Sequence, residues 1–343
     1  MSWRHLVGQS TVDWVLEDDV PAVRAFALRR LLDRAVDDPE VVTARAAAMR
    51  CDPIRAILDA QEPDGHWGEA GPGYYPKYTG TVWQLMFLDQ LGADPADERV
   101  QRACDYVLEH TPTSVGGMGA VASRPDAAPL PSATIHCLNG NLVRALVGFG
   151  RLDDPRVRAA IDWAARAATG EGMDRYYRSG TSGPCFECAA NDRHPCAWGA
   201  VKELLAFARI PPRRRTPIVR QAIEAGVDLL LSVDPATAAY PTADRDSKPS
   251  GAWFQLGFPS AYVTDVLQNL EALTELGRGR DPRLANAVGW LVDQRDDAGR
   301  WHNRHAYNGK TTVPFERQGA PSKWVTARAC AVLTAVPVPA GAR

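Results

Sequence analysis

The stretch Thr81-Val-Trp-Gln-Leu-Met-Phe-Leu-Asp-Gln-Leu-Gly92 predicts an apolar helix that ends at a glycine. The chain repeats this pattern at 140–150, 198–207 and 264–273, and a fifth copy starts at Ser322-Lys-Trp-Val-Thr. Successive copies begin about 60 residues apart, which is long enough for a helix pair and a loop. The sequence is therefore built from repeated helical units.

Each of the four apolar helices is followed by a second, more polar helix. These second helices are predicted at 99–108, 156–168, 219–231 and 283–292. A helix pair cannot bury its apolar side alone, so it needs like neighbours on both sides. The apolar helices suit an inner layer and the polar helices an outer one. We therefore predict an all-α protein, an α/α toroid of five to six helix pairs, in preference to an open solenoid.

No linker divides the repeats from one another. We expect residues 51–343 to form a single toroid domain, and residues 1–50 to form a helical extension packed on its outside. Hydrophobic residues at 45% and charged residues at 23% exclude a disordered chain. A net charge of −2 argues against nucleic acid as a partner. The sequence does not define an oligomeric state.

The N-terminal residues mix Trp3, Arg4 and His5 and contain no apolar core of a signal peptide. No apolar stretch approaches the ~20 residues that a membrane span needs. We therefore expect a cytoplasmic protein without an integral membrane segment. In a reducing compartment the seven cysteines are not expected to form structural disulfides.

Gln61-Glu-Pro-Asp-Gly65-His-Trp67 follows an apolar helix end, and 294–301 is a looser copy with one residue inserted. These segments resemble the Gln-Trp repeat of squalene/hopene cyclases. The segments 13–24, 257–265 and 320–326 are similar to bacterial proteins described as squalene-cyclase-like or prenyltransferase-like. The resemblance is to the terpenoid cyclase/protein prenyltransferase superfamily, in a single-barrel bacterial form. It implies the α/α toroid fold.

The activities of those families do not carry over with the fold. The acidic Asp-x-Asp-Asp motif of class II terpene cyclases is absent, and Asp244-Arg-Asp246 is the nearest sequence to it. The Asp, Cys and His zinc ligands of protein prenyltransferases are not recognisable either. From the fold resemblance, together with the cysteine group and the aromatic loops described below, we expect a zinc-binding enzyme of cyclase, transferase or lyase type. It would act on a small, mostly apolar molecule, such as an isoprenoid, in the barrel. The alternative is a non-catalytic binding or scaffold protein with a structural zinc.

The strongest chemical signal is a group of three cysteines, Cys185, Cys188 and Cys196. Cys185-x-x-Cys188 has the spacing with which two thiolates hold one metal ion. Cys137 is the best candidate for a fourth ligand, and His136 is the next, because Cys137 and Cys196 precede successive inner helices. We predict a Zn²⁺ site. An iron–sulfur cluster, a redox disulfide and buried free thiols are the alternatives.

The loops before the inner helices collect aromatic and polar side chains. We predict an aromatic-lined cavity there, with substrate contacts from Tyr78, Trp83, Trp198, Trp253, His302 and Trp324. The competing interpretation is that these aromatic residues brace neighbouring helix pairs. Candidate catalytic residues are Asp265, Tyr262 and His136. Asp265 alternatively caps the helix that follows it.

Overall fold

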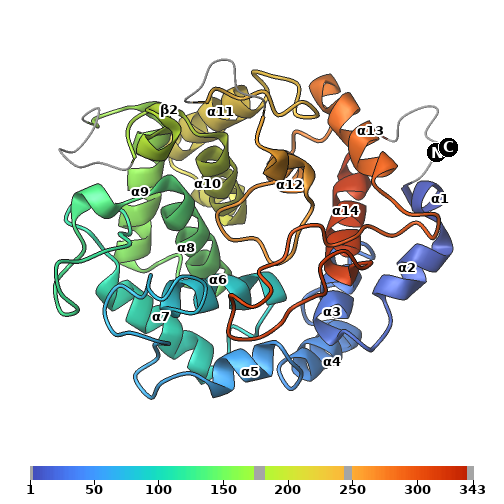
Figure 1. The fold of residues 1–343 in the computed structure, drawn as a ribbon, viewed down its shortest axis with the longest axis horizontal. Helices are drawn as coiled ribbons and strands as arrows, with labels where there is room; N and C mark the ends of the chain where they lie inside the picture. Colours follow the sequence, from blue (N-terminus) through green and yellow to red (C-terminus); the bar gives the residue numbers. More distant parts are fainter. Residues whose placement is uncertain (1–2, 174–181, 243–248, 338–343) are drawn as a thin grey trace.

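Two concentric layers of helices form a ring in the computed structural model, which describes residues 3–173, 182–242 and 249–337 (Figure 1). The inner helices are α3 (Pro21–Arg30), α6 (Thr81–Leu91), α8 (His136–Gly148), α10 (Ala197–Arg209), α12 (Val266–Glu275) and α14 (Lys323–Ala335). The outer helices are α4 (Pro39–Ala48), α5 (Ile54–Asp59), α7 (Glu98–His110), α9 (Pro155–Thr169), α11 (Pro217–Leu230) and α13 (Ala285–Asp293). The fold is the predicted α/α toroid.

Consecutive inner helices pack against one another from α6 through α8, α10, α12 and α14 to α3. Side-chain chemistry explains the two layers. In α6 all residues but Gln90 are buried, whereas α7 is exposed along one face, at Glu98, Arg102, Asp105 and Glu109. A helix that is apolar on all sides needs neighbours all round, and the inner layer supplies them.

The two Gln-Trp-like segments make the same hydrogen bonds. The indole N–H of Trp67 donates to the carbonyl of Ile57, and that of Trp301 to the carbonyl of Leu291, each at 2.7 Å. The backbone N–H of each tryptophan donates to a threonine hydroxyl of the following inner helix at 3.0 Å. Both tryptophans therefore tie an outer helix to an inner one, which is a bracing role.

The N-terminal region contributes to the ring itself. Helix α3 contacts α14 and α4, while α1 (Trp3–Val7) and α2 (Gln9–Val15) pack on α14. The ammonium of Lys323 at the start of α14 binds Glu17 at 2.7 Å and also binds Asp19. The boundary between residues 1–50 and the rest of the chain stays a prediction.

Short elements complete the described chain. A two-stranded antiparallel sheet pairs β1 (Glu187–Cys188) with β2 (His194–Pro195), in the register Glu187 with Pro195. The short 3₁₀ helices are Pro131–Ala133, Ala189–Asn191, Pro212–Arg214, Gly251–Phe254 and Pro282–Leu284.

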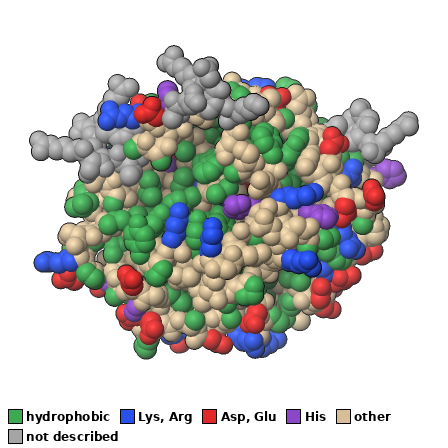
Figure 2. Space-filling view, viewed as in Figure 1, with side chains coloured by type: hydrophobic (Ala, Val, Ile, Leu, Met, Phe, Trp, Pro, Cys, Tyr) green, Lys and Arg blue, Asp and Glu red, His purple; other side chains and the backbone are tan. Residues whose placement is uncertain are grey.

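The connection between α13 and α14 crosses the centre of the ring in this view (Figure 1). Acidic side chains lie mostly around the edge of the same face (Figure 2). No helix in the described residues is both long and apolar enough to span a membrane.

Candidate functional site: an arginine-lined cavity

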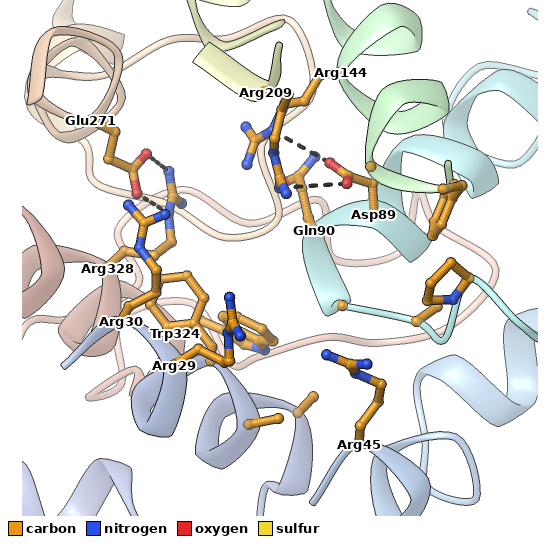
Figure 3. Close-up of a pocket in the computed structure, with 18 of the residues that line it drawn as sticks. Arg29, Arg30, Arg45, Asp89, Gln90, Arg144, Arg209, Glu271, Trp324 and Arg328 are labelled. Carbon is orange, nitrogen blue, oxygen red and sulfur yellow. Dashed lines mark hydrogen bonds and ion pairs between the residues drawn. The ribbon is translucent and has the colours of Figure 1, made fainter. Parts of the chain in front are cut away.

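A cavity of about 380 Å³ lies inside the ring, where the C-terminal turns of four inner helices meet. Helices α6, α8, α10 and α12 contribute residues from their C-terminal halves, and α14 contributes Trp324 and Arg328. The hairpin of α3 and α4 forms the wall opposite these helices (Figure 3). Exposed Val36 lies at the rim, so the cavity is open to solvent there. We call this space the arginine cavity.

Its lining carries more positive than negative side chains. Six arginines line it, against three carboxylates. The arginines are Arg29, Arg30, Arg45, Arg144, Arg209 and Arg328, and the carboxylates are Asp89, Glu271 and Glu275. Apolar side chains, among them Phe26, Phe149, Phe258 and Trp324, complete the wall. Clefts lined by one sign of charge concentrate oppositely charged molecules.

Asp89 is shared by two of the arginines. Its carboxylate lies 3.4 Å from Arg144 Nε and 3.6 Å from Arg209 Nη2 (Figure 3). A Cβ added at Gly148 would lie 2.7 Å from Asp89 Oδ1, so the bare backbone of α8 makes room for this carboxylate. One carboxylate neutralises one of the two guanidinium groups, and a positive charge remains at this wall.

Two further pairs are balanced. Arg328 binds Glu271 through two parallel bonds, at 2.7 Å from Nε and 2.5 Å from Nη2, and Arg30 binds Glu275 at 2.8 Å. Burial alone would raise the pKa of Glu271, but the guanidinium of Arg328 outweighs it and holds that pKa below its ordinary value. Glu271 is therefore an ionised partner of arginine and not a proton donor.

Arg29 and Arg45 have no hydrogen-bond or ion-pair partner within the described parts of the chain. They extend from α3 and α4 toward the opposite wall of the cavity (Figure 3). Unpaired guanidinium groups that converge on a concave space are suited to hold a carboxylate or phosphate, because each offers planar, forked N–H donors. These two side chains are the main source of the positive excess.

The predicted metal ligands lie elsewhere, at the N-terminal ends of α8 and α10. Cys137 is in the first turn of α8 and Cys196 caps α10, with its sulfur 3.4 Å from the backbone nitrogen of Gly199. The thiols of Cys137 and Cys188 both lie close enough to Cys196 to shift its pKa. The Cys137 contact and burial raise the pKa of Cys196 to about 12.

Cys185 is exposed, and its sulfur faces the carbonyl of Thr169 at 3.9 Å. The structure thus brings three of the four predicted thiols together. Among the described residues no group of three or more His, Cys, Asp or Glu is arranged to hold a metal ion. The Zn²⁺ site and its iron–sulfur alternative stay predictions.

His136 is fully enclosed beside this thiol group. Its Nδ1 lies 2.8 Å from Glu203 Oε1, and its Nε2 lies 3.1 Å from the carbonyl of Gly183. Burial opposes the charged imidazole, yet the carboxylate of Glu203 raises the pKa of His136. Both ring nitrogens are occupied, so in this geometry His136 links α8 to α10 and has no free nitrogen for a metal ion.

Most of the predicted substrate contacts pack against other aromatic rings. Trp83 lies between Tyr78 and Tyr262, with ring centroids 4.9 and 5.0 Å away, and Trp198 meets Trp253 at 6.4 Å. The His302 ring bonds to Asp296 at 2.9 Å and to the carbonyl of Gly319 at 3.0 Å. Of the six predicted contacts, Trp324 is the one that lines the arginine cavity.

The remaining candidates occupy the same end of the barrel as the thiols. Asp265 is the N-cap of α12: it accepts from the backbone N–H of Gln268 at 2.8 Å and from that of Gly257 at 3.1 Å. Burial raises the pKa of Asp265 and that of Tyr262. Neither residue lines the arginine cavity. Asp244-Arg-Asp246 lies outside the described residues.

Sequence reasoning missed Lys202 as well as the arginine cavity. Lys202 is 1% exposed, its ammonium bonds to the side-chain oxygen of Gln268, and burial lowers its pKa to about 7. The signal for it was the pair Lys202-Glu203 in an otherwise apolar stretch. The cavity arginines gave no such signal, because they come from helices far apart in the chain.

No protein-family model matches the chain, and no curated protein matches it. The chain is similar in structure to an unsaturated glucuronyl hydrolase specific for heparin, with 11% identity, a TM-score of 0.50, and coverage of 94% of this chain and 85% of that one. It is also similar to type II terpene cyclase MstE from Scytonema (16% identity, TM-score 0.45, 92% and 87% covered) and to cellobiose 2-epimerase from Spirochaeta thermophila (15%, 0.43, 88% and 98%). At such identities the likeness shows the fold alone, which agrees with the resemblance drawn from the Gln-Trp segments.

Proposed function

We propose that the protein binds a small organic anion, a carboxylate or a phosphate, in the arginine cavity. The observation that carries this proposal is the pair Arg29 and Arg45, which converge on the cavity without a partner among the described residues. The other cavity arginines each have a carboxylate within ion-pair distance. A ligand anion therefore has two guanidinium groups free to receive it.

Helix ends offer a second explanation for the arginines, since cations at helix C-termini are favourable. Arg30 and Arg209 fit that role, because they lie in the last turn of their helices. Arg29 and Arg45 also lie in the last turns of α3 and α4, but neither donates to a carbonyl within the described chain. A purely structural role predicts that neutralising them weakens the fold, whereas a binding role predicts that it weakens ligand binding.

The cavity carboxylates do not supply a free acid or base. Glu271, Glu275 and Asp89 all face arginines, so they hold the guanidinium groups in place. The arrangement thus supports binding and orientation of the anion, and the proposal does not assign a chemical step to it. The ligand proposed here carries a negative charge, whereas the sequence predicted a mostly apolar ligand.

Calorimetric titration of the full chain with phenyl phosphate tests this proposal, with benzyltrimethylammonium as the cation of similar size. We expect phenyl phosphate to bind and the cation not to bind. Arg29→Gln and Arg45→Gln should each weaken phenyl phosphate binding about tenfold or more, the value of one charge-assisted hydrogen bond. Their melting temperatures should stay close to that of the unmodified protein.

Arg50→Gln is the matched control, since Arg50 is exposed just beyond the end of α4 and does not line the cavity. It should leave binding unchanged. Equal binding of the cation, or equal affinity in Arg29→Gln, Arg45→Gln and Arg50→Gln, would overturn the proposal. Loss of binding together with a large fall in melting temperature would support the structural role instead.

The cysteines near the N-terminal ends of α8 and α10 support a second proposal, a zinc ion held by Cys137, Cys188, Cys196 and Cys185. Its support is that Cys137 and Cys188 both lie near Cys196, and that Cys137 and Cys196 are at the N-terminal ends of α8 and α10, where the helix dipole stabilises a metal-bound thiolate. Cys185 would have to turn inward to complete four ligands. Such a site, at the opposite ends of the inner helices from the arginine cavity, would be structural.

A further inference from the structure

A second chamber of about 150 Å³ adjoins the arginine cavity. The two spaces share three wall residues, Ala22, Phe258 and Trp324. Val20, Ala48, Ile54, Leu91 and Phe315 supply much of the rest of the second wall. We call this second space the apolar chamber.

A stacked aromatic pair lines both spaces. The rings of Phe258 and Trp324 lie 4.5 Å apart with an interplanar angle of 11°, and Phe26 meets the edge of Trp324 at 5.8 Å. The faces of these rings line both spaces and give their shared boundary an apolar surface. A ligand that reaches from the arginine cavity into the apolar chamber would lie along these rings.

The walls of the two spaces differ in the sign of their charged residues, since arginines predominate in the arginine cavity and only carboxylates occur in the apolar chamber. The apolar chamber has no arginine or lysine in its wall, and its charged residues are Asp19, Asp52 and Glu316. Each of these is occupied: Asp19 by Lys323, Asp52 by Arg55, and Glu316 by the backbone N–H of Trp324 at 3.3 Å. Asp19 and Asp52 are balanced by cations, and no arginine or lysine of the chamber wall offers a ligand anion a partner. An acid group therefore belongs among the arginines, and an apolar group belongs in the chamber.

We propose that the two spaces form one site for an anionic amphiphile, with its acid group in the arginine cavity and its apolar portion in the apolar chamber beyond Phe258 and Trp324. This inference rests on the proposed function and adds the substrate class and the orientation. Burial of apolar surface then supplies affinity, while the guanidinium groups fix which end enters first.

Titration of the full chain with butyl, hexyl and octyl phosphate tests the inference. Each methylene that enters the chamber should tighten binding about fourfold, until the chamber is full. Val20→Trp and Ala48→Leu narrow the chamber from two sides and should abolish this gain with chain length. Both variants should still bind phenyl phosphate as the unmodified protein does. Val42→Trp is the matched control, since Val42 is 50% exposed on α4 and lines neither space.

Two outcomes would overturn the inference while leaving anion binding in place. One is equal affinity for the three alkyl phosphates, and the other is a gain with chain length that survives in both Val20→Trp and Ala48→Leu. Tighter binding of 8-aminooctyl phosphate than of octyl phosphate would also overturn it, because the chamber would then accept a cation. Absence of binding by every phosphate would instead be a failure of the proposed function. Melting curves show whether Val20→Trp and Ala48→Leu are folded. One folded variant of the two is enough for the test.

Discussion

Gly148 lies so close to Asp89 that a single added carbon at this glycine would come within 2.7 Å of the carboxylate oxygen Oδ1. The last residue of α8 thus gives Asp89 the room in which it meets Arg144 and Arg209. An inner-helix glycine and an inner-helix aspartate together set the position of two cavity arginines. A side chain added at Gly148 should therefore change the free energy of unfolding of the protein.

Gly148→Ala should gain less stability than alanine ordinarily gives in a helix. The new methyl group must shift the Asp89 carboxylate against its two arginines, which offsets the propensity gain. Gly289→Ala in α13 is the control, because nothing lies within 4 Å of its added carbon. It should stabilise the protein by about 0.5–1 kcal/mol. Urea unfolding of both variants checks the prediction, and equal stabilisation of the two would contradict it.

Arg328→Gln should be far more costly than Arg29→Gln. Arg328 is 8% exposed and holds Glu271, whose side chain is 12% exposed, through two bonds, so its loss leaves this carboxylate without its main partner and should cost about 3 kcal/mol. Arg29 is exposed and has no partner in the described chain, so its change should stay within about 0.5 kcal/mol. Chemical denaturation at neutral pH measures both values.

The cost of Arg328→Gln should also depend on pH. The pKa of Glu271 in the folded protein is below its ordinary value of 4.5. The stability that the pair contributes is therefore fully present above pH 4.5 and is lost as the pH falls through the folded pKa. The difference between the unmodified protein and Arg328→Gln should shrink as the pH is lowered from 4.5. A difference that grows on acidification would show that another group carries it.

The repeat was sufficient to predict the ring because each copy carries its own signal. The predicted start at Thr81 is the first residue of α6, the predicted start at Ser322 is the N-cap of α14, and glycine ends α6 at Gly92 as expected. Helix α8 begins at His136, ahead of the glycine where the repeat pattern starts. The backbone there is helical before the apolar pattern begins, so the pattern alone sets this boundary too late.

The arginine cavity could not be predicted in the same way. Arg29, Arg144 and Arg328 belong to three helices and have no motif in common. Each looks in the sequence like a charge on the outer side of a helix. Whether an arginine faces a cavity or solvent depends on how the helices rotate in the ring, and periodicity of apolar residues does not fix that rotation in helices that are buried on all sides. The thiol group, by contrast, was visible because its spacing is local.

Trp67→Phe and Trp301→Phe should each destabilise the protein by about 1–2 kcal/mol more than Trp163→Phe. The first two changes leave the carbonyls of Ile57 and Leu291 without the indole donor. The indole nitrogen of Trp163 is buried without a hydrogen-bond partner among the described residues, so its removal breaks no bond. All three tryptophans are almost fully buried, so each change to phenylalanine removes the same volume from a buried side chain. Equal destabilisation in thermal unfolding would show that packing, and not the hydrogen bonds, makes the brace.

Cys188→Ser should remove a bound zinc ion, while Cys51→Ser should leave the metal content unchanged. The second proposal expects one zinc per chain in protein purified with zinc present, measured by elemental analysis. Cys188 and Cys137 both lie near Cys196, whereas Cys51 is an exposed cysteine just beyond the end of α4.

Thiols must lose their protons to bind the metal, so zinc affinity should fall as the pH is lowered. Chelation should expose the segment that contains Cys185 and Cys188 to protease before the helical circular dichroism signal is lost, since α8 and α10 are also held by their packing on each other. Full occupancy in Cys188→Ser would rule out this thiol group as the metal site. Retained zinc in Cys185→Ser would show that three thiols suffice and that the exposed Cys185 stays where the structure places it.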